Sequence, residues 1–268
     1  MILMQKIARL HSPLFFGFTL LLLTSILPSN VAYPLTANNV QVEKASFWLQ
    51  SQQQDDGGFE LAGSPGFETP DVIAAIASSV QNGNTYDSSA AFSTIQSLVK
   101  SSKSPLDYVD DLVDSEFTSG TACKLIVNVA GPLGLDPRDF DPSDDSDLQI
   151  DLVSKIETSV LSDGSFGSGV LNTTLTCAIA LFVSSGKISD KTIQYIEKSQ
   201  SDDGSFNYAG DPSLSDGGAD TTGLALETLV AAGINRGDVS IDKALRYLAN
   251  TLSKDGSYLN FGVPDPNS

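Results

Sequence analysis

Residues 48–59 read WLQSQQQDDGGF, and the end of this stretch returns three more times along the chain. The later copies are VLSDGSF at 160–166, KSQSDDGSF at 198–206 and TLSKDGSY at 251–258. In each copy an Asp-Gly pair separates a run of apolar or amphipathic sequence from an aromatic residue. Glycine adopts positive φ at little steric cost, and Asp side chains bond backbone N–H groups in turns. We therefore interpret each copy as a corner, where one helix ends and an aromatic ring enters the apolar layer.

The spacing of these corners predicts a repeat. The Asp-Gly pairs begin at Asp56, Asp163, Asp203 and Asp255, and a degraded copy fits the long first gap where an apolar run reaches Ser-Ser-Lys-Ser-Pro at 101–105. The resulting period of roughly 40 to 55 residues is long enough for two helices and their connections. The sequence therefore predicts tandem helix pairs.

The first corner gives the most specific expectations. The preceding helix should end at Gln52 or Gln53, and the chain should turn through 55–58. Phe59 should then be buried in the apolar layer beside Trp48. The Asp-rich turns lack the regular ligand spacing of a calcium-binding loop, so we assign them a structural role.

The predicted helices are of two kinds. Residues 241–252 place apolar side chains on one face and charged ones on the other, which is typical of an outer helix that borders solvent. Other segments are apolar nearly all round, which is typical of buried inner helices. These segments are 71–77, 122–130, 176–183 and 222–232. The alternation predicts two concentric helical layers, and we find no convincing strand pattern.

Boundary residues support these helices from both ends. A glycine follows three of the inner segments, where a left-handed C-terminal residue is favoured. These glycines are Gly131, Gly186 and Gly233. Polar residues near the helix starts are candidates to accept hydrogen bonds from free N–H groups. They are Ser119, Thr173 and Asp220. From Val40 onwards we expect about nine helices, the last ending near residue 252, with NFGVPDPNS at 260–268 leading towards a further helix.

Charge and the N-terminus restrict the function. The net charge of −18 opposes binding to nucleic acid or anionic lipid surfaces. Lys6 and Arg9 precede an apolar run at 14–27, which is shorter than the ~20 residues that span a bilayer. We interpret 1–32 as a signal peptide, so the mature chain is secreted or extracytoplasmic and has no stable transmembrane span. An uncleaved membrane anchor is the alternative.

Export would permit a disulfide between the only two cysteines, Cys123 and Cys177. They lie about one period apart and at similar distances before Gly131 and Gly186, hence at similar heights on neighbouring inner helices. A bridge forms if their Cα atoms come within about 7 Å. The alternative is two small buried hydrophobic residues.

Three stretches carry a resemblance to a known family. WLQSQQQDDGGF at 48–59, IEKSQSDDGSF at 196–206 and ADTTGLALETLVAAG at 219–233 resemble the prenyltransferase/squalene-oxidase repeat. Terpene cyclases, protein prenyltransferase β-subunits and the helical domain of cobalamin carriers such as intrinsic factor and transcobalamin share this repeat. The resemblance covers residues 38–268 and implies an all-α (α/α) toroid of tandem helix pairs. With about nine helices, we expect that toroid to be incomplete.

The resemblance does not extend to catalytic groups. Squalene-cyclase-like enzymes protonate an alkene with an Asp-x-Asp-Asp-Thr motif, and here Ala219 stands at the proton-donor position, followed by Asp220. Prenyltransferases hold zinc with Asp, Cys and His, whereas the only histidine is His11, within the signal peptide. The acidic clusters at 107–111 and 141–145 have the wrong spacing, and we assign them to polar connections as solvated loop or cap charges. We expect no catalytic residue, metal site or cofactor.

We therefore expect a secreted, non-catalytic module that binds a hydrophobic or corrinoid-like ligand, or a protein partner covering its open C-terminal end. A terpene (squalene) cyclase-like or prenyltransferase-like enzyme with degenerate motifs is the alternative, and a structural surface protein is a third hypothesis. The candidate ligand-binding residues, called here the mouth residues, lie where the inner helices begin. They are Thr69, Asp71, Ser119, Thr121, Thr173, Thr174, Asp220, Thr221 and Thr222.

Overall fold

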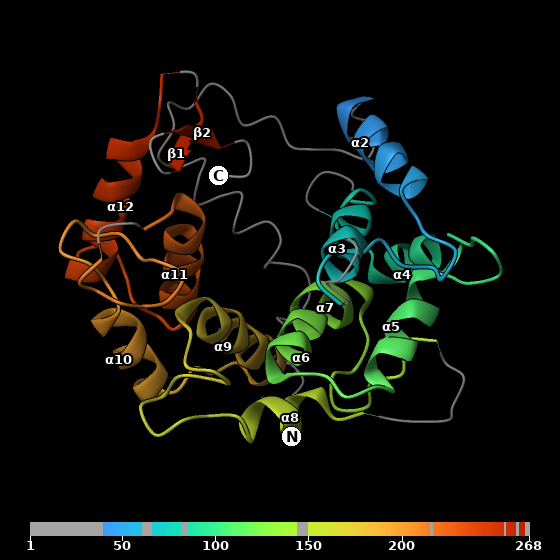
Figure 1. Cartoon of the computed structure of the whole chain (residues 1–268), viewed down its shortest axis with the longest axis horizontal. Coiled ribbons are helices and arrows are strands. Elements are labelled where there is room, and N and C mark those ends of the chain that lie inside the picture. The colour runs from blue at the N-terminus through green and yellow to red at the C-terminus, as the bar shows by residue number, and fades with distance from the viewer. Residues whose placement is uncertain are drawn as a thin grey trace, which may run out of the picture. The chain divides into compact units, whose positions relative to one another are not determined.

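The computed structural model describes residues 40–60, 66–81, 85–143, 150–214, 217–254, 256–260 and 263–265. The predicted signal peptide at 1–32 lies outside these residues. Within them the protein is all-α apart from one short hairpin, as the sequence predicts (Figure 1). The chain divides into two compact units. The first extends to Leu112 and includes 132–135 and 142–144, and the second contains the remainder.

The first unit is built around α3. It contains α2 (Val40–Ser51), α3 (Thr69–Ser78), α4 (Ser88–Gln96) and nearly all of α5 (Pro105–Val113). Helix α3 packs against α2 and α4 and buries Ile73 and Ile76. Helix α2 ends one residue before the range that the sequence predicts, and none of its side chains is buried.

The second unit has inner and outer helices. Its helices are α6 (Ser119–Leu125) with the π-helical turn η2 (Ile126–Ala130), α8 (Leu152–Glu157), α9 (Leu171–Ser185), α10 (Asp190–Lys198), α11 (Ala219–Ala231) and α12 (Val239–Thr251). Helix α9 contacts both α6 and α11. Helix α8 contacts α6 and α9, α10 contacts α9 and α11, and α12 contacts α11. The predicted alternation is therefore present in this unit, while closure into a toroid stays a prediction.

One apolar cluster joins α9, α10, α11 and α12. Its members come from the inner faces of these helices and from the corner between α10 and α11. They are Leu171, Leu175, Ile196, Phe206, Ala225, Leu226, Leu229, Ile241 and Ala244. Helices α10 and α12 each bury one stripe of side chains and carry charged residues on their other faces, as expected for outer helices.

A disulfide joins two inner helices of this unit. Cys123 in α6 and Cys177 in α9 are bonded, with their Cα atoms 4.7 Å apart. Both side chains are buried. The structure thus has the bridge rather than the pair of free buried cysteines that the sequence left as the alternative.

Three corners share one geometry. Their glycines, Gly57, Gly164 and Gly204, have φ values of +91°, +95° and +94°. The Asp before each glycine accepts a hydrogen bond from the backbone N–H two residues further on, at 2.9 to 3.0 Å. The aromatic residue that follows is buried in each corner, as predicted. The Asp-Gly pair therefore acts as a turn whose carboxylate binds its own backbone.

The corners also attach to the outer helices. A Cβ atom added to Gly57, Gly164 or Gly204 would lie 2.2 to 2.5 Å from backbone atoms at or near the start of the next outer helix. In two corners a glutamine bonds both the corner glycine and a second segment of the chain. Gln53 Nε2 donates to the carbonyls of Gly57 and Leu98, and Gln200 Nε2 donates to those of Gly204 and Ser240.

Tyrosines of the outer helices form a second repeated contact, which we did not predict from the sequence. Each phenol hydroxyl bonds a backbone atom of the loop that leads into an inner helix. The pairs are Tyr108 with Gly66, Tyr195 with Gly169 and Tyr247 with Gly217. These bonds fix the loops near the starts of the inner helices.

The glycines predicted to end inner helices adopt two backbone conformations. Gly186 ends α9 with φ of +73°, and Gly233 follows α11 with φ of +89°, as predicted. Gly131 has a helical φ of −58°, because η2 continues into the short helix α7 (Gly131–Leu133). The prediction that Gly131 ends its helix is therefore wrong, and Gly134 takes the left-handed conformation instead, with φ of +71°.

The predicted capping roles near the helix starts are wrong. An N-cap residue lies outside the helix in an extended conformation, as Thr118 does before α6. Val170 and Gly218 precede α9 and α11, and neither supplies a side-chain acceptor. The three residues proposed as caps lie instead within the first turns of their helices. They are Ser119, Thr173 and Asp220.

The acidic cluster at 107–111 lies in α5, so its assignment to a polar connection is wrong. Asp107 has the predicted cap role, since its Oδ2 accepts from the backbone N–H of Ser104 at 2.6 Å and from the Ser104 hydroxyl at 2.7 Å. Ser104 Oγ in turn accepts from the N–H of Asp107 at 3.3 Å. This capping box, with Pro105 in the first helical turn, is a helix-start signal that the sequence carries.

The stretch at 260–268, which we expected to lead towards a further helix, contributes to a short hairpin within its described residues. Strands β1 (Tyr258–Asn260) and β2 (Val263–Asp265) pair antiparallel, with Leu259 opposite Pro264. The strands are too short to give a recognisable alternation in the sequence.

Candidate functional site

Three mouth residues form hydrogen bonds to the corners. Thr69, Thr174 and Thr222 are buried, and the Oγ1 of each accepts a hydrogen bond from the backbone N–H of the corner phenylalanine in its own repeat. The distances are 2.9, 3.2 and 3.0 Å. An unsatisfied buried N–H group costs about 1–3 kcal/mol, so a ligand could recruit these hydroxyls only by disrupting the corner.

The structure brings Ser119 and Thr173 together. Both lie beside Gly167, where an added Cβ would be 2.9 Å from Ser119 Oγ and 3.8 Å from Thr173 Cγ2. Thr121 is paired within its own helix start, with its hydroxyl 3.0 Å from that of Thr118. The first turns of α6 and α9 thus form one half-exposed polar surface.

The remaining mouth residues belong to α3 and α11. Asp71 is exposed in the first turn of α3, where the helix dipole interacts favourably with a negative charge. In α11, Ala219 and Thr221 are buried and Asp220 is exposed. Asp71 belongs to the first unit and α11 to the second, so each is described within its own unit.

Glu60 was not among the residues selected from the sequence. Its side chain is buried, and its carboxylate accepts from three consecutive backbone N–H groups at the start of α3. Oε2 accepts from Phe67 at 3.1 Å and Glu68 at 2.9 Å, and Oε1 accepts from Thr69 at 3.0 Å. The chain therefore supplies its own anion to the N-terminus of α3.

We expect Glu60→Gln to destabilise the protein by about 1–3 kcal/mol at pH 7, because a charged acceptor of three buried bonds becomes neutral. Burial alone would raise the pKa of Glu60, but the hydrogen bonds from Glu68 and Thr69 lower it overall. This contribution to stability is present above the unfolded-state pKa and is lost as pH falls through the lower folded-state pKa.

Urea unfolding from pH 7 down to pH 3 measures this effect. The stability of the wild type should fall more steeply than that of the Gln variant below the ordinary glutamate pKa of about 4.3. Equal pH dependence of the two proteins would contradict the role of the Glu60 carboxylate.

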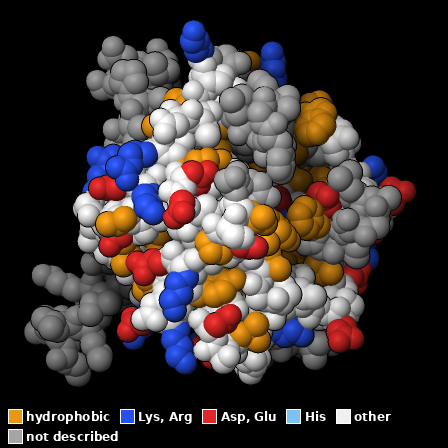
Figure 2. Space-filling model, turned by 60° about the vertical axis from the view of Figure 1, so that its left-hand side comes forward, with side chains coloured by type: hydrophobic (Ala, Val, Ile, Leu, Met, Phe, Trp, Pro, Cys, Tyr) orange, Lys and Arg blue, Asp and Glu red, His pale blue; other side chains and the backbone are white. Residues whose placement is uncertain are grey.

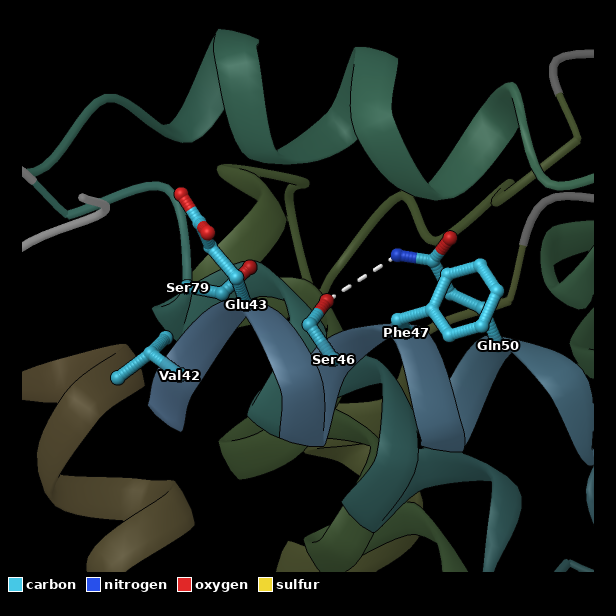
Figure 3. A pocket seen from close by; sticks show the side chains of 6 residues that line it. All are labelled: Val42, Glu43, Ser46, Phe47, Gln50 and Ser79. Carbon is cyan, nitrogen blue, oxygen red and sulfur yellow. Dashed lines mark hydrogen bonds between the residues drawn. The ribbon is translucent and has the colours of Figure 1, made fainter. Parts of the chain in front are cut away.

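A shallow hollow lies between α2 and the end of α3 (Figure 3). Its volume is about 290 Å³, near the lower end of the range for small-molecule sites. Five residues of α2 and one following α3 line it. They are Val42, Glu43, Ser46, Phe47, Gln50 and Ser79. Gln50 Nε2 donates to Ser46 Oγ at 3.1 Å, so the hollow has both apolar and hydrogen-bonding groups.

The helix beside this hollow exposes large aromatic side chains. Phe47 is 74% exposed and Trp48 is 61% exposed. Phe59 is buried as predicted, but the prediction that Trp48 packs in the apolar layer beside it is wrong. Among the described helices, α2 packs chiefly against α3. Figure 2 views the molecule from the side that lies at the left of Figure 1 and shows apolar side chains mixed with charged ones on that face.

The described residues limit the chemistry of a site. Among them, no three His, Cys, Asp or Glu residues lie close enough together to hold a metal ion. A helix long and apolar enough to cross a membrane is likewise missing from the part of the chain that the structure covers. Within the described residues, the hollow on α2 and the exposed aromatic side chains beside it offer a surface from which a binding function can be argued.

Comparison with known proteins found no matching family model and no matching curated protein. The relation to the prenyltransferase/squalene-oxidase repeat consequently remains a proposal that depends on the corner motifs. The geometry of the three corners shows why those motifs recur, since each performs the same turn and the same attachment.

Proposed function

We propose that this protein is a secreted, non-catalytic binding module of the prenyltransferase/squalene-oxidase repeat type, whose contact surface is the exposed side of α2. The observation that carries the proposal is the pair Phe47 and Trp48, both largely exposed beside the hollow. Exposed aromatic residues are costly in water and are enriched at the centres of binding surfaces.

The lining of the hollow favours a neutral, hydrophobic ligand with one polar group. Phe47 and Val42 offer apolar contacts, while Gln50 and Ser46 offer hydrogen bonds. Glu43 disfavours an anionic ligand by charge repulsion. The volume of about 290 Å³ suits a small isoprenoid alcohol or an apolar side chain, whereas a corrinoid ring would extend beyond it.

The environment at the start of α11 favours binding over cyclase chemistry. Protonation of an alkene needs a strong acid inside a desolvated cavity. The buried position is occupied by Ala219, which has no acid, and the neighbouring carboxylate of Asp220 is exposed to water. We therefore place the function in recognition rather than in catalysis.

Trp48 is the only tryptophan in the chain and lies next to Phe47, so its fluorescence reports on this surface. We expect emission typical of an exposed indole in the free protein. Titration with farnesol, a neutral isoprenoid alcohol, should shift the emission to shorter wavelengths and raise the melting temperature by mass action. Phe47→Ala should weaken binding about tenfold or more, because it removes an aromatic contact worth at least ~1.4 kcal/mol.

Tyr208→Ala is the matched control, since Tyr208 is 63% exposed but belongs to the second unit. It should leave the titration unchanged. Equal binding by the Phe47 variant would remove α2 as the contact surface. Conversion of an isoprenoid to product that disappears in Asp220→Asn would replace the binding proposal with the enzyme.

A further inference from the structure

The chain contains one sequence motif for N-linked glycosylation, Asn172-Thr173-Thr174. An asparagine followed by any residue except proline and then by Ser or Thr is the acceptor motif in exported proteins. The other asparagines of the 268-residue sequence lack the hydroxyl residue at the required spacing. The motif lies in the first turn of α9, within the second unit.

The backbone N–H and carbonyl of Asn172 both form hydrogen bonds, whereas its side-chain carboxamide forms none with the described residues. Its N–H donates to the Tyr208 carbonyl at 3.2 Å, and its carbonyl accepts from Thr176 Oγ1 at 3.1 Å. In the part of the chain that the structure describes, the carboxamide of Asn172 makes no hydrogen bond. Replacing one amide hydrogen with a sugar would therefore break no bond of the folded protein.

The position of Asn172 leaves space for a substituent. The side chain is partly exposed. Side chains of a helix tilt towards its N-terminus, so one in the first turn points beyond the helix end rather than along its body. Tyr208, whose carbonyl contacts Asn172, is 63% exposed, and an aromatic ring of this kind offers an apolar surface to the C–H groups of a sugar.

We propose that Asn172 carries an N-linked glycan. The inference rests on the export included in the proposed function. The donor is an oligosaccharide linked to a polyisoprenyl diphosphate. The amide nitrogen of Asn172 forms a bond to C1 of the first sugar, the bond between C1 and the diphosphate oxygen breaks, and the amide loses a proton. The polyisoprenyl diphosphate leaves with the electron pair, and no group is oxidised or reduced.

The structure also places this transfer before folding. Thr174 is fully buried, and its hydroxyl accepts from the N–H of Phe166 at 3.2 Å and donates to the Val170 carbonyl at 3.0 Å. Recognition of the motif requires the hydroxyl two residues after the asparagine. Once α9 and its corner have formed, that hydroxyl is no longer accessible. The glycan must be added while this segment is still unfolded.

The test is peptide mass spectrometry of the full chain, produced with its own leader in a secretory cell that performs N-glycosylation. The peptide containing Asn172 should carry a hexosamine-based glycan, and peptide N-glycosidase should convert that residue to Asp. Asn172→Gln should abolish the modification. Thr174→Ser keeps the motif and a hydroxyl for the Phe166 bond, so it should remain modified, whereas Thr174→Val should not.

Two outcomes overturn the proposal in distinguishable ways. A secreted chain with an unmodified Asn172 contradicts the glycan and leaves the binding module intact. An unmodified chain retained in the cell contradicts both the glycan and the proposed export. As a second measurement, purified unglycosylated protein should accept a glycan from an oligosaccharyltransferase only after it is unfolded, and modification of the folded form would contradict the assigned order.

Discussion

Replacing Gly204 with alanine should lower the free energy of unfolding by about 4 kcal/mol, a loss large enough to be diagnostic of a specific mechanism. Two effects add in this variant. The backbone has φ of +94°, where a side chain costs about 1–2 kcal/mol. The new Cβ would also lie 2.3 Å from the carbonyl oxygen of Lys243, so α12 would have to move away from the corner.

Two other glycines separate these effects. Gly233 has φ of +89°, but nothing lies within 4 Å of an added Cβ, so Gly233→Ala should show only the backbone cost. Gly223 lies within α11 with open space around its Cβ position, and Gly223→Ala should stabilise the protein by up to about 1 kcal/mol. Urea unfolding of the three variants measures the differences. Similar losses for Gly204→Ala and Gly233→Ala would show that the corner does not press against α12.

Removing the bridge between Cys123 and Cys177 should destabilise the protein by about 4 kcal/mol, as chain entropy predicts for a loop of this length. The two cysteines are 54 residues apart, and they tie α6 to α9. A Cys123→Ala/Cys177→Ala double variant should therefore unfold at lower urea concentration than the oxidised wild type. Both positions are buried and alanine is small, so repacking should contribute less than the lost cross-link.

Reductant provides the matched control for the bridge. It should lower the stability of the wild type to nearly that of the double variant, and it should leave the double variant unchanged. Thiol titration of the unfolded, non-reduced wild type should detect no free thiol. Two free thiols, or a wild type insensitive to reductant, would contradict the bridge.

The corners could be predicted because their chemistry is local. An Asp followed by Gly places a hydrogen-bond acceptor next to the residue that most readily adopts positive φ, and both effects act within a few residues. The prediction at Gly57, Gly164 and Gly204 therefore agrees with the structure. The capping box of Ser104 and Asp107 is equally local. Its sequence pattern indicates that a helix starts here, although we assigned 107–111 to a polar connection.

The mouth residues show why the candidate site was harder to predict. Helical spacing placed Thr174 and Thr222 correctly near the starts of inner helices. Which hydroxyls are engaged depends on where the corner phenylalanine lies after the chain has turned, and this is a contact between segments. The carboxylate of Glu60 likewise accepts hydrogen bonds from backbone N–H groups seven to nine residues later in the chain, a contact that no local pattern predicts.

The amino-acid sequence by itself determined the all-α class and the turns at three corners, because hydrophobic periodicity and Asp-Gly chemistry act over short distances. Tertiary structure alone decided that α2 exposes Trp48 while Phe59 is buried, and that Cys123 meets Cys177. An aromatic residue in an amphipathic segment has the same local preference whether or not another element covers it. Its burial, and with it the surface left for binding, depends on which helices pack together.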